Sequence, residues 1–166
     1  MIFLETERLI LRNLKSEDAV IMYDYRNHPQ CSKYQRGQTK DLQGIVELVN
    51  KRQFDILTTE YPFMVAVALK DTNEMIGEIV VMPNDGAITL GYTFSYKYHR
   101  KGFAFEALSA FIEMLHEKYP DWEFICFTDT ENLASMTLLK KLGYKDLGYA
   151  EKITSQVFGK WIQTEI

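Results

Sequence analysis

The residues best placed to do chemistry lie between Tyr92 and Glu106, in the stretch YTFSYKYHRKGFAFE. There an apolar strand pattern leads through a short basic turn directly into a helical pattern. The first N–H groups of a helix have no partner within it and carry partial positive charge, so they can hold an anion. Gly102 allows a ligand to approach the backbone closely, and Ala104 keeps the first helical turn slim. Three basic side chains add positive charge at this turn: His99, Arg100 and Lys101.

Two interpretations of this turn follow from the residues alone. It is a phosphate or pyrophosphate site, or it is a tight strand-to-helix turn whose charges are solvated. It is not a Walker A loop, because the G-x-x-x-x-G-K-[ST] pattern is missing, and one glycine does not make a dinucleotide fingerprint. A nucleotide-binding protein that uses the same anion site is an alternative, but the chain lacks the motifs that such proteins usually carry.

Glu78 is a second residue with chemical potential, because it is a carboxylate within the apolar strand pattern MIGEIVV. A carboxylate there could act as a general base with a raised pKa. Alternatively, Glu78 is an ordinary strand residue on a half-solvated face of a sheet.

The elements that position these residues follow from the spacing of apolar side chains. The run from Phe63 to Leu69 is almost unbroken, as expected of a strand covered on both faces. The turn residues Pro83 to Gly86 separate two further strands of an antiparallel meander. Strands are predicted at 7–13, 63–69, 75–81, 87–94 and 122–128, with two more within 144–166, and helices at about 16–27, 39–56, 104–119 and 132–142.

Together these elements predict an α/β (α+β) fold in one domain, residues 1–166. We expect a mixed, mostly antiparallel central sheet of about seven strands, flanked by about four helices. The strands before and after the helix at 104–119 should be parallel, because strand, helix, strand is a crossover connection.

Composition excludes several classes of protein. With 19 Lys and Arg against 23 Asp and Glu, the chain has a net charge of −4, which argues against general nucleic-acid binding. No apolar stretch reaches the roughly 18 residues of a membrane helix, and the start lacks the pattern of a signal peptide. Cys31 and Cys126 match no metal spacing, so we expect no metal. These features favour a cytoplasmic protein.

Three segments resemble one family in the order that the family has them. The turn HRKGFA resembles the Q/R-x-x-G-x-G/A acetyl-coenzyme A motif of the GNAT N-acetyltransferases. The opening ETERLILRNL and the segment LGYTFSYKYHRKGFAFEAL resemble the branch of the ribosomal-protein N-acetyltransferases (RimJ/RimL-like). NLASMTLLKKLGY resembles its N-x-x-S helix, which ends in Leu-Gly-aromatic. The predicted order of elements is also that of the family.

This resemblance implies acetyl-CoA as co-substrate. Backbone groups of Tyr92, Thr93 and Phe94 would pair with the pantetheine arm, where this strand splays away from the strand that ends at Thr128. Amides of the turn would hold the pyrophosphate. The implied cofactor-binding residues are Tyr92, Thr93, Phe94, His99, Arg100, Lys101, Gly102, Phe103, Ala104, Asn132 and Ser135.

The resemblance also implies roles for the residues of the N-x-x-S helix. Ser135 would donate to the leaving thiolate, or else it returns a hydrogen bond to its own helix backbone. Asn132 would bind the cofactor and could also be the helix N-cap. Leu139 stands where many relatives carry a tyrosine general acid, and Thr89 stands where many in this branch have a glutamate.

The polar stretch 27–39 lines the acceptor side in the resembling family. Its residues His28 and Tyr34 are therefore candidates for substrate binding, or else polar residues of an ordinary loop. The expected activity is acetyl transfer to a primary amine by direct attack on the thioester. The acceptor would be a protein N-terminus, a polyamine, an amino acid or a similar small amine. An inactive acyl-CoA-binding regulatory module is the alternative, and a homodimer is possible.

Overall fold

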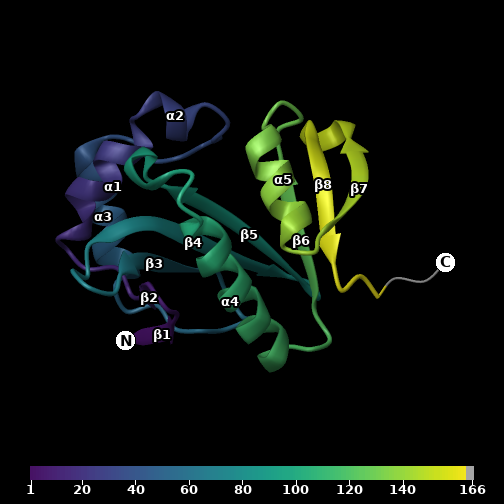
Figure 1. Cartoon of the computed structure of the whole chain (residues 1–166), viewed down its shortest axis with the longest axis horizontal. Coiled ribbons are helices and arrows are strands. Elements are labelled where there is room, and N and C mark those ends of the chain that lie inside the picture. The colour runs from purple at the N-terminus through teal and green to yellow at the C-terminus, as the bar shows by residue number, and fades with distance from the viewer. Residues whose placement is uncertain (164–166) are drawn as a thin grey trace.

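One mixed sheet organises the computed structural model, which describes residues 1–163 (Figure 1). Its strands lie in the order β1-β2-β3-β4-β5-β6-β8-β7. Every neighbouring pair is antiparallel except β5 and β6, which are parallel as predicted. The strands are β1 (Ile2–Glu5), β2 (Leu9–Arg12), β3 (Phe63–Leu69), β4 (Met75–Asn84), β5 (Ala87–Phe94), β6 (Glu123–Thr128), β7 (Lys145–Ala150) and β8 (Ser155–Lys160).

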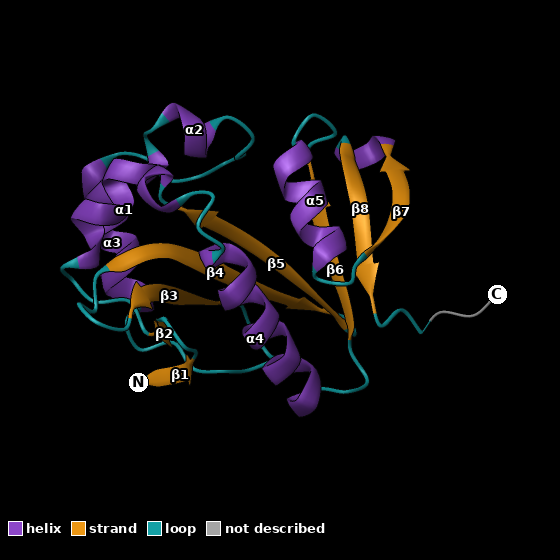
Figure 2. Ribbon diagram, in the orientation of Figure 1, coloured by secondary structure: helices purple, strands orange, loops and turns teal. Residues whose placement is uncertain are grey.

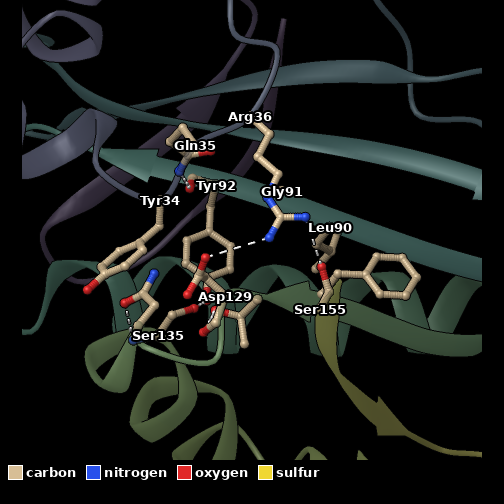
Figure 3. A pocket seen from close by; sticks show the side chains of 12 residues that line it. Tyr34, Gln35, Arg36, Leu90, Gly91, Tyr92, Asp129, Ser135 and Ser155 are labelled. Carbon is tan, nitrogen blue, oxygen red and sulfur yellow. Dashed lines mark hydrogen bonds and ion pairs between the residues drawn. The ribbon is translucent and has the colours of Figure 1, made fainter. Parts of the chain in front are cut away.

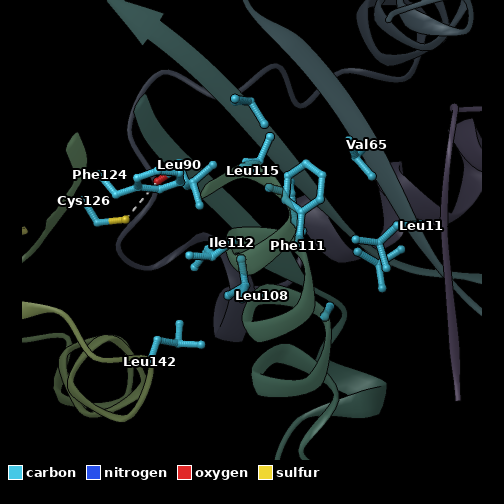
Figure 4. Close-up of a cluster of buried hydrophobic side chains, with 14 of the residues drawn as sticks. Leu11, Val65, Leu90, Leu108, Phe111, Ile112, Leu115, Phe124, Cys126 and Leu142 are labelled. Carbon is cyan, nitrogen blue, oxygen red and sulfur yellow. Dashed lines mark hydrogen bonds between the residues drawn. The ribbon is translucent and has the colours of Figure 1, made fainter. Parts of the chain in front are cut away.

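Helices cover both faces of the sheet (Figure 2). On one face α1 and α3 enclose a cluster that includes Tyr25, Ile45 and Ala66. On the other face α4 places Leu108 and Phe111 against the central strands, in the larger core cluster (Figure 4). The helices are α1 (Asp18–Arg26), α2 (Pro29–Ser32), α3 (Leu42–Arg52), α4 (Phe103–Lys118) and α5 (Leu133–Lys141).

The central strand β3 has the predicted bounds because its apolar run is buried on both faces. Six of its seven residues are buried. The end of α5 also follows the prediction, since Gly143 takes the left-handed conformation with φ +94° that favours glycine after a helix.

Strands β5 and β6 separate after a short paired region, and this separation positions the site. Their parallel pairing joins Ala87–Thr89 to residues 123–125. Each strand then continues for several residues toward α2 and α5, and the two diverge toward that end of the molecule (Figure 1). The predicted splay between the strand that ends at Phe94 and the strand that ends at Thr128 is confirmed.

Strand β1 and helix α2 are short elements that the sequence did not predict. Strand β1 has four residues with mixed exposure, and α2 is a single turn within the stretch expected to be a loop. Both are too short to show a reliable period in the sequence. Strands β7 and β8 lie within the expected stretch 144–166, whose last three residues fall outside the described part. No helix among residues 1–163 combines the length and apolar character needed to cross a membrane.

Candidate active site

The turn before α4 presents a row of backbone donors. Gly102 is the N-cap residue with φ +80°, and Arg100 also has a positive φ of +63°. The helical ladder begins with the Glu106 amide, which donates to the Gly102 carbonyl at 3.0 Å. Within residues 1–163 no protein acceptor takes a hydrogen bond from the amides of residues 100–105. This row fits the pyrophosphate of acetyl-CoA, because consecutive outward N–H groups at a helix start bind such anions.

The side chains around this turn hold its shape. The His99 Nε2 atom lies 2.8 Å from the Phe94 carbonyl oxygen and so links the turn to the end of β5. Arg8 donates from Nη1 to the Lys101 carbonyl at 3.2 Å and from Nε to Glu106 at 2.7 Å. Partial burial opposes ionisation of Glu106, but hydrogen bonds from Thr6 and Arg8 prevail and lower its pKa. The sequence analysis did not predict that Arg8, from the N-terminal segment, holds this turn in place.

A cavity of about 240 Å³ opens where β5 and β6 diverge (Figure 3). Its walls come from β5, from the end of β6 and the start of α5, from the α2–α3 loop (residues 33–41), and from the first residue of β8. The lining residues are Tyr34, Gln35, Arg36, Leu90, Gly91, Tyr92, Phe127, Thr128, Asp129, Asn132, Ser135 and Ser155.

Two hydroxyl groups meet across this cavity. The Tyr92 hydroxyl oxygen lies 2.8 Å from the Ser135 Oγ atom, and either can be the donor. Burial raises the pKa of Tyr92 well above its ordinary value, although the hydrogen bond to Ser135 opposes the rise. Ser135 therefore bonds to the opposite wall and not to its own helix backbone. Asn132 is the N-cap of α5, because its side chain accepts from the Ser135 amide at 3.1 Å.

The diverging edge of β5 also carries groups that could bind a ligand. The Tyr92 carbonyl accepts from Gln35 Nε2 at 3.3 Å, and the Phe94 carbonyl accepts from Cys31 Sγ at 3.3 Å as well as facing His99. The Thr93 hydroxyl accepts from Gln38 at 3.0 Å. Side chains of α2 and the α2–α3 loop thus already reach the edge that, by the resemblance, would bind the pantetheine arm.

Glu78 lies on the other face of the sheet from the Tyr92–Ser135 pair. It is 1% exposed, so the expected half-solvated face is wrong. One carboxylate oxygen accepts from the Tyr25 hydroxyl at 2.7 Å and from Arg26 Nε at 2.9 Å, and the other is bonded by Arg26 Nη2. Glu78 does not line the cavity. Its position is that of a buried ion pair between β4 and α1, so a base role would require the carboxylate to leave Arg26.

The two predicted acceptor-side residues have different positions. Tyr34 lines the cavity, and its hydroxyl donates to the Glu131 carbonyl at 3.2 Å. His28 does not line it. The His28 ring stacks on Tyr96 with 3.6 Å between centroids, and its Nδ1 accepts from the Gln30 amide as the N-cap of α2.

The cavity contains charged residues that the sequence interpretation did not single out, Arg36 and Asp129. Arg36 Nη2 lies 3.6 Å from the Asp129 carboxylate. Both residues come from loops that are far apart in the sequence, and neither belongs to a periodic pattern. No local signal could have brought them together.

Comparison with known proteins agrees with this fold. The family model described as the GNAT acetyltransferase domain matches residues 8–145. The uncharacterized N-acetyltransferase YnaD of Bacillus subtilis is 28% identical over 149 residues, which cover 89% of this chain and 85% of that protein. The chain belongs to the GNAT family of acetyltransferases.

Solved structures with low sequence identity share the fold. A GNAT-family acetyltransferase from Bacillus anthracis aligns with a TM-score of 0.81 and 22% identity, covering 96% of both chains. RimL, a ribosomal L7/L12 α-N-protein acetyltransferase solved in complex with coenzyme A, aligns with a TM-score of 0.77 and 13% identity. That alignment covers 96% of this chain and 97% of RimL.

Proposed function

We propose that this protein uses acetyl-CoA to acetylate a primary amine, as a relative of the RimJ/RimL-like branch. The observation that carries the proposal is the row of amides at residues 100–105, which have no protein acceptor within residues 1–163. These amides begin α4 beside the diverging ends of β5 and β6. The complex of RimL with coenzyme A supports this assignment, because the two chains share the fold.

The residues present divide into three groups along an extended ligand. The amides of residues 100–105, together with Arg100 and Lys101, would hold the pyrophosphate. Backbone groups of Tyr92 to Phe94 would bind the pantetheine arm, and Gln35 would move from the Tyr92 carbonyl if that carbonyl is needed. Asn132 would add a polar contact from the start of α5.

Acetyl-CoA supplies an acyl group on a thiol that leaves readily, since a free thiol has a pKa of about 8.5. The chain must hold the amine against the thioester and stabilise charge as the bond to sulfur breaks. Ser135 is the proposed donor to the leaving sulfur, because its hydroxyl faces the cavity. The Tyr92 hydroxyl, which burial keeps protonated, holds the Ser135 hydroxyl in place.

Glu78 has a structural role in this proposal. Both of its oxygens are bonded by α1, and it fixes that helix on β4. The ammonium proton of the acceptor would leave to water or to a group within the cavity.

An inactive module that binds acyl-CoA is the second candidate, and the leucine at position 139 favours it. The hydroxyl pair weighs against it, because Tyr92 brings a phenol to the cavity from the opposite wall.

One experiment separates the two candidates. Purified protein is titrated with acetyl-CoA by calorimetry and then incubated with protein N-termini, polyamines and amino acids while free thiol is measured. We expect binding and thiol release with at least one class of amine. Binding without release across the panel would favour the inactive module, and absence of binding would refute both.

A further inference from the structure

Asp129 is the one acidic side chain among the residues that line the cavity within the described part of the chain. It follows the last residue of β6, on the wall that also carries Asn132 and Ser135. In Figure 3 a dashed line joins its carboxylate to the Arg36 guanidinium. Because Glu78 lies on the other face in an ion pair, Asp129 is the carboxylate that a molecule in this cavity would meet.

The Asp129 carboxylate has bonding capacity left. Its Oδ1 accepts from the Glu131 amide at 2.9 Å, which fixes the side chain. Its Oδ2 faces Arg36 at 3.6 Å, which is longer than a hydrogen bond. An ionised carboxylate can accept about four hydrogen bonds, so an additional donor can be accommodated. The side chain is 31% exposed and is therefore accessible.

Arg36 is held mainly by other groups. Its guanidinium donates to the Ile153 carbonyl at 3.0 Å, to the Thr154 carbonyl at 2.9 Å and to the Thr154 hydroxyl at 3.0 Å. These neutral oxygens belong to the turn between β7 and β8. These contacts hold Arg36 independently of Asp129, so a donor that binds Asp129 need not displace it.

We infer that Asp129 binds the ammonium group of the acceptor amine. The inference rests on the proposed acetyl transfer and adds to it the residue that recognises the acceptor and the charge of the group recognised. Asp129 shares the cavity with the Tyr92–Ser135 pair, so an amine bound there lies in the space where the reaction takes place. A small aliphatic amine and a peptide N-terminus share this ammonium chemistry.

The test uses the full chain and three amines: 1,4-diaminobutane, an amino-acid amide and a tetrapeptide with a free N-terminus. Thiol release gives KM and kcat, and calorimetry gives the affinity of each amine for the protein saturated with coenzyme A. The variants are Asp129→Asn, Asp129→Ser and Asp129→Glu. Asp121→Asn, an exposed residue before β6, is the matched control. Asn and Ser can both still accept from the Glu131 amide, so one neutral variant remains if the other fails to fold.

We expect the neutral variants to raise KM or Kd for the amine about tenfold or more, because a hydrogen bond to a charged group is lost, with kcat within about threefold. Affinity for coenzyme A should be unchanged, Asp129→Glu should retain most of the amine affinity, and Asp121→Asn should match the wild type. Amine affinity of the wild type should fall with added salt more steeply than that of the neutral variants. The amines whose affinity falls in the neutral variants show whether the site accepts a small aliphatic amine, an amino-acid amide or a peptide N-terminus.

An unchanged amine KM or Kd in the neutral variants would overturn the inference, and so would a loss confined to kcat. Failure of the proposed function looks different, because the wild type would then release no thiol with any amine. In that case calorimetric titration with the amines still tests whether Asp129 binds the ammonium group. Amine binding that depends on Asp129 supports the inference, and no amine binding by the wild type refutes it.

Discussion

The hydroxyl oxygens of Tyr92 and Ser135 lie 2.8 Å apart, although the residues belong to opposite walls of the cavity. Tyr92 comes from β5 and Ser135 from the first turn of α5. Position 139 on α5 carries a buried leucine, so the phenol at this site comes from the strand and not from the helix. The pair fixes the direction of the Ser135 hydroxyl, which on its own would rotate freely.

Removing either hydroxyl of this pair should slow turnover. General acid catalysis is typically worth about 10²–10⁴-fold, so we expect Ser135→Ala to lower kcat by about 10²-fold. Tyr92→Phe should lower it less, because Ser135 still reaches the cavity. Steady-state thiol release measures both, with Tyr149→Phe on the exposed side of β7 as the control. Full activity of Ser135→Ala would show that the leaving thiolate takes its proton from another source.

The buried tyrosines predict loss of stability at alkaline pH. Burial raises the pKa values of Tyr25, Tyr92 and Tyr144 in the folded protein. In the unfolded chain a tyrosine titrates near 10. The unfolded state therefore loses protons first, and stability that is complete below about pH 10 falls by about 1.4 kcal/mol per pH unit for each group above it.

Thermal melts between pH 8 and about pH 11.5 check this prediction. Tyr144→Phe removes one of the three groups and should make the alkaline decline of Tm shallower, whereas Tyr149→Phe should not. An alkaline decline of the same steepness in Tyr144→Phe would contradict the assignment.

Alanine substitutions at Gly102 and Gly86 separate the cost of backbone strain in stability from an effect on cofactor binding. Both have positive φ, +80° and +84°, and an added Cβ would meet nothing closer than 3.5 Å at Gly102 and nothing within 4 Å at Gly86. Alanine at either position should cost about 1 kcal/mol of stability, because left-handed backbone disfavours a side chain. Only Gly102→Ala should weaken binding of coenzyme A, measured by calorimetry. Equal affinities in the two variants would argue against the amide row as the pyrophosphate site.

The sequence predicts those parts of this protein whose determinants are local. The bounds of β3 and β5 follow from apolar runs between turn residues, and the amide row follows from one strand-turn-helix segment. The cavity depends on contacts between distant loops, such as Arg36 with Thr154, which are 118 positions apart. The burial of Glu78 could not be predicted for the same reason, because its partner Arg26 is 52 positions away and no pattern links them.

The ion pair of Glu78 and Arg26 gives the clearest test of whether Glu78 is structural or catalytic. Replacing one partner of a buried pair leaves the other charge uncompensated, so Glu78→Gln should lower the free energy of unfolding by about 3–5 kcal/mol. Glu47→Gln, at an exposed position of α3, is the matched control and should change stability by less than about 0.5 kcal/mol. The double variant Arg26→Met with Glu78→Leu removes both charges and should recover part of the loss. Chemical denaturation measures all three, and thiol release is measured at a temperature where each variant is folded. A Glu78→Gln protein as stable as the wild type but without turnover would restore Glu78 as the base, because the carboxylate would then matter to the reaction and not to the fold.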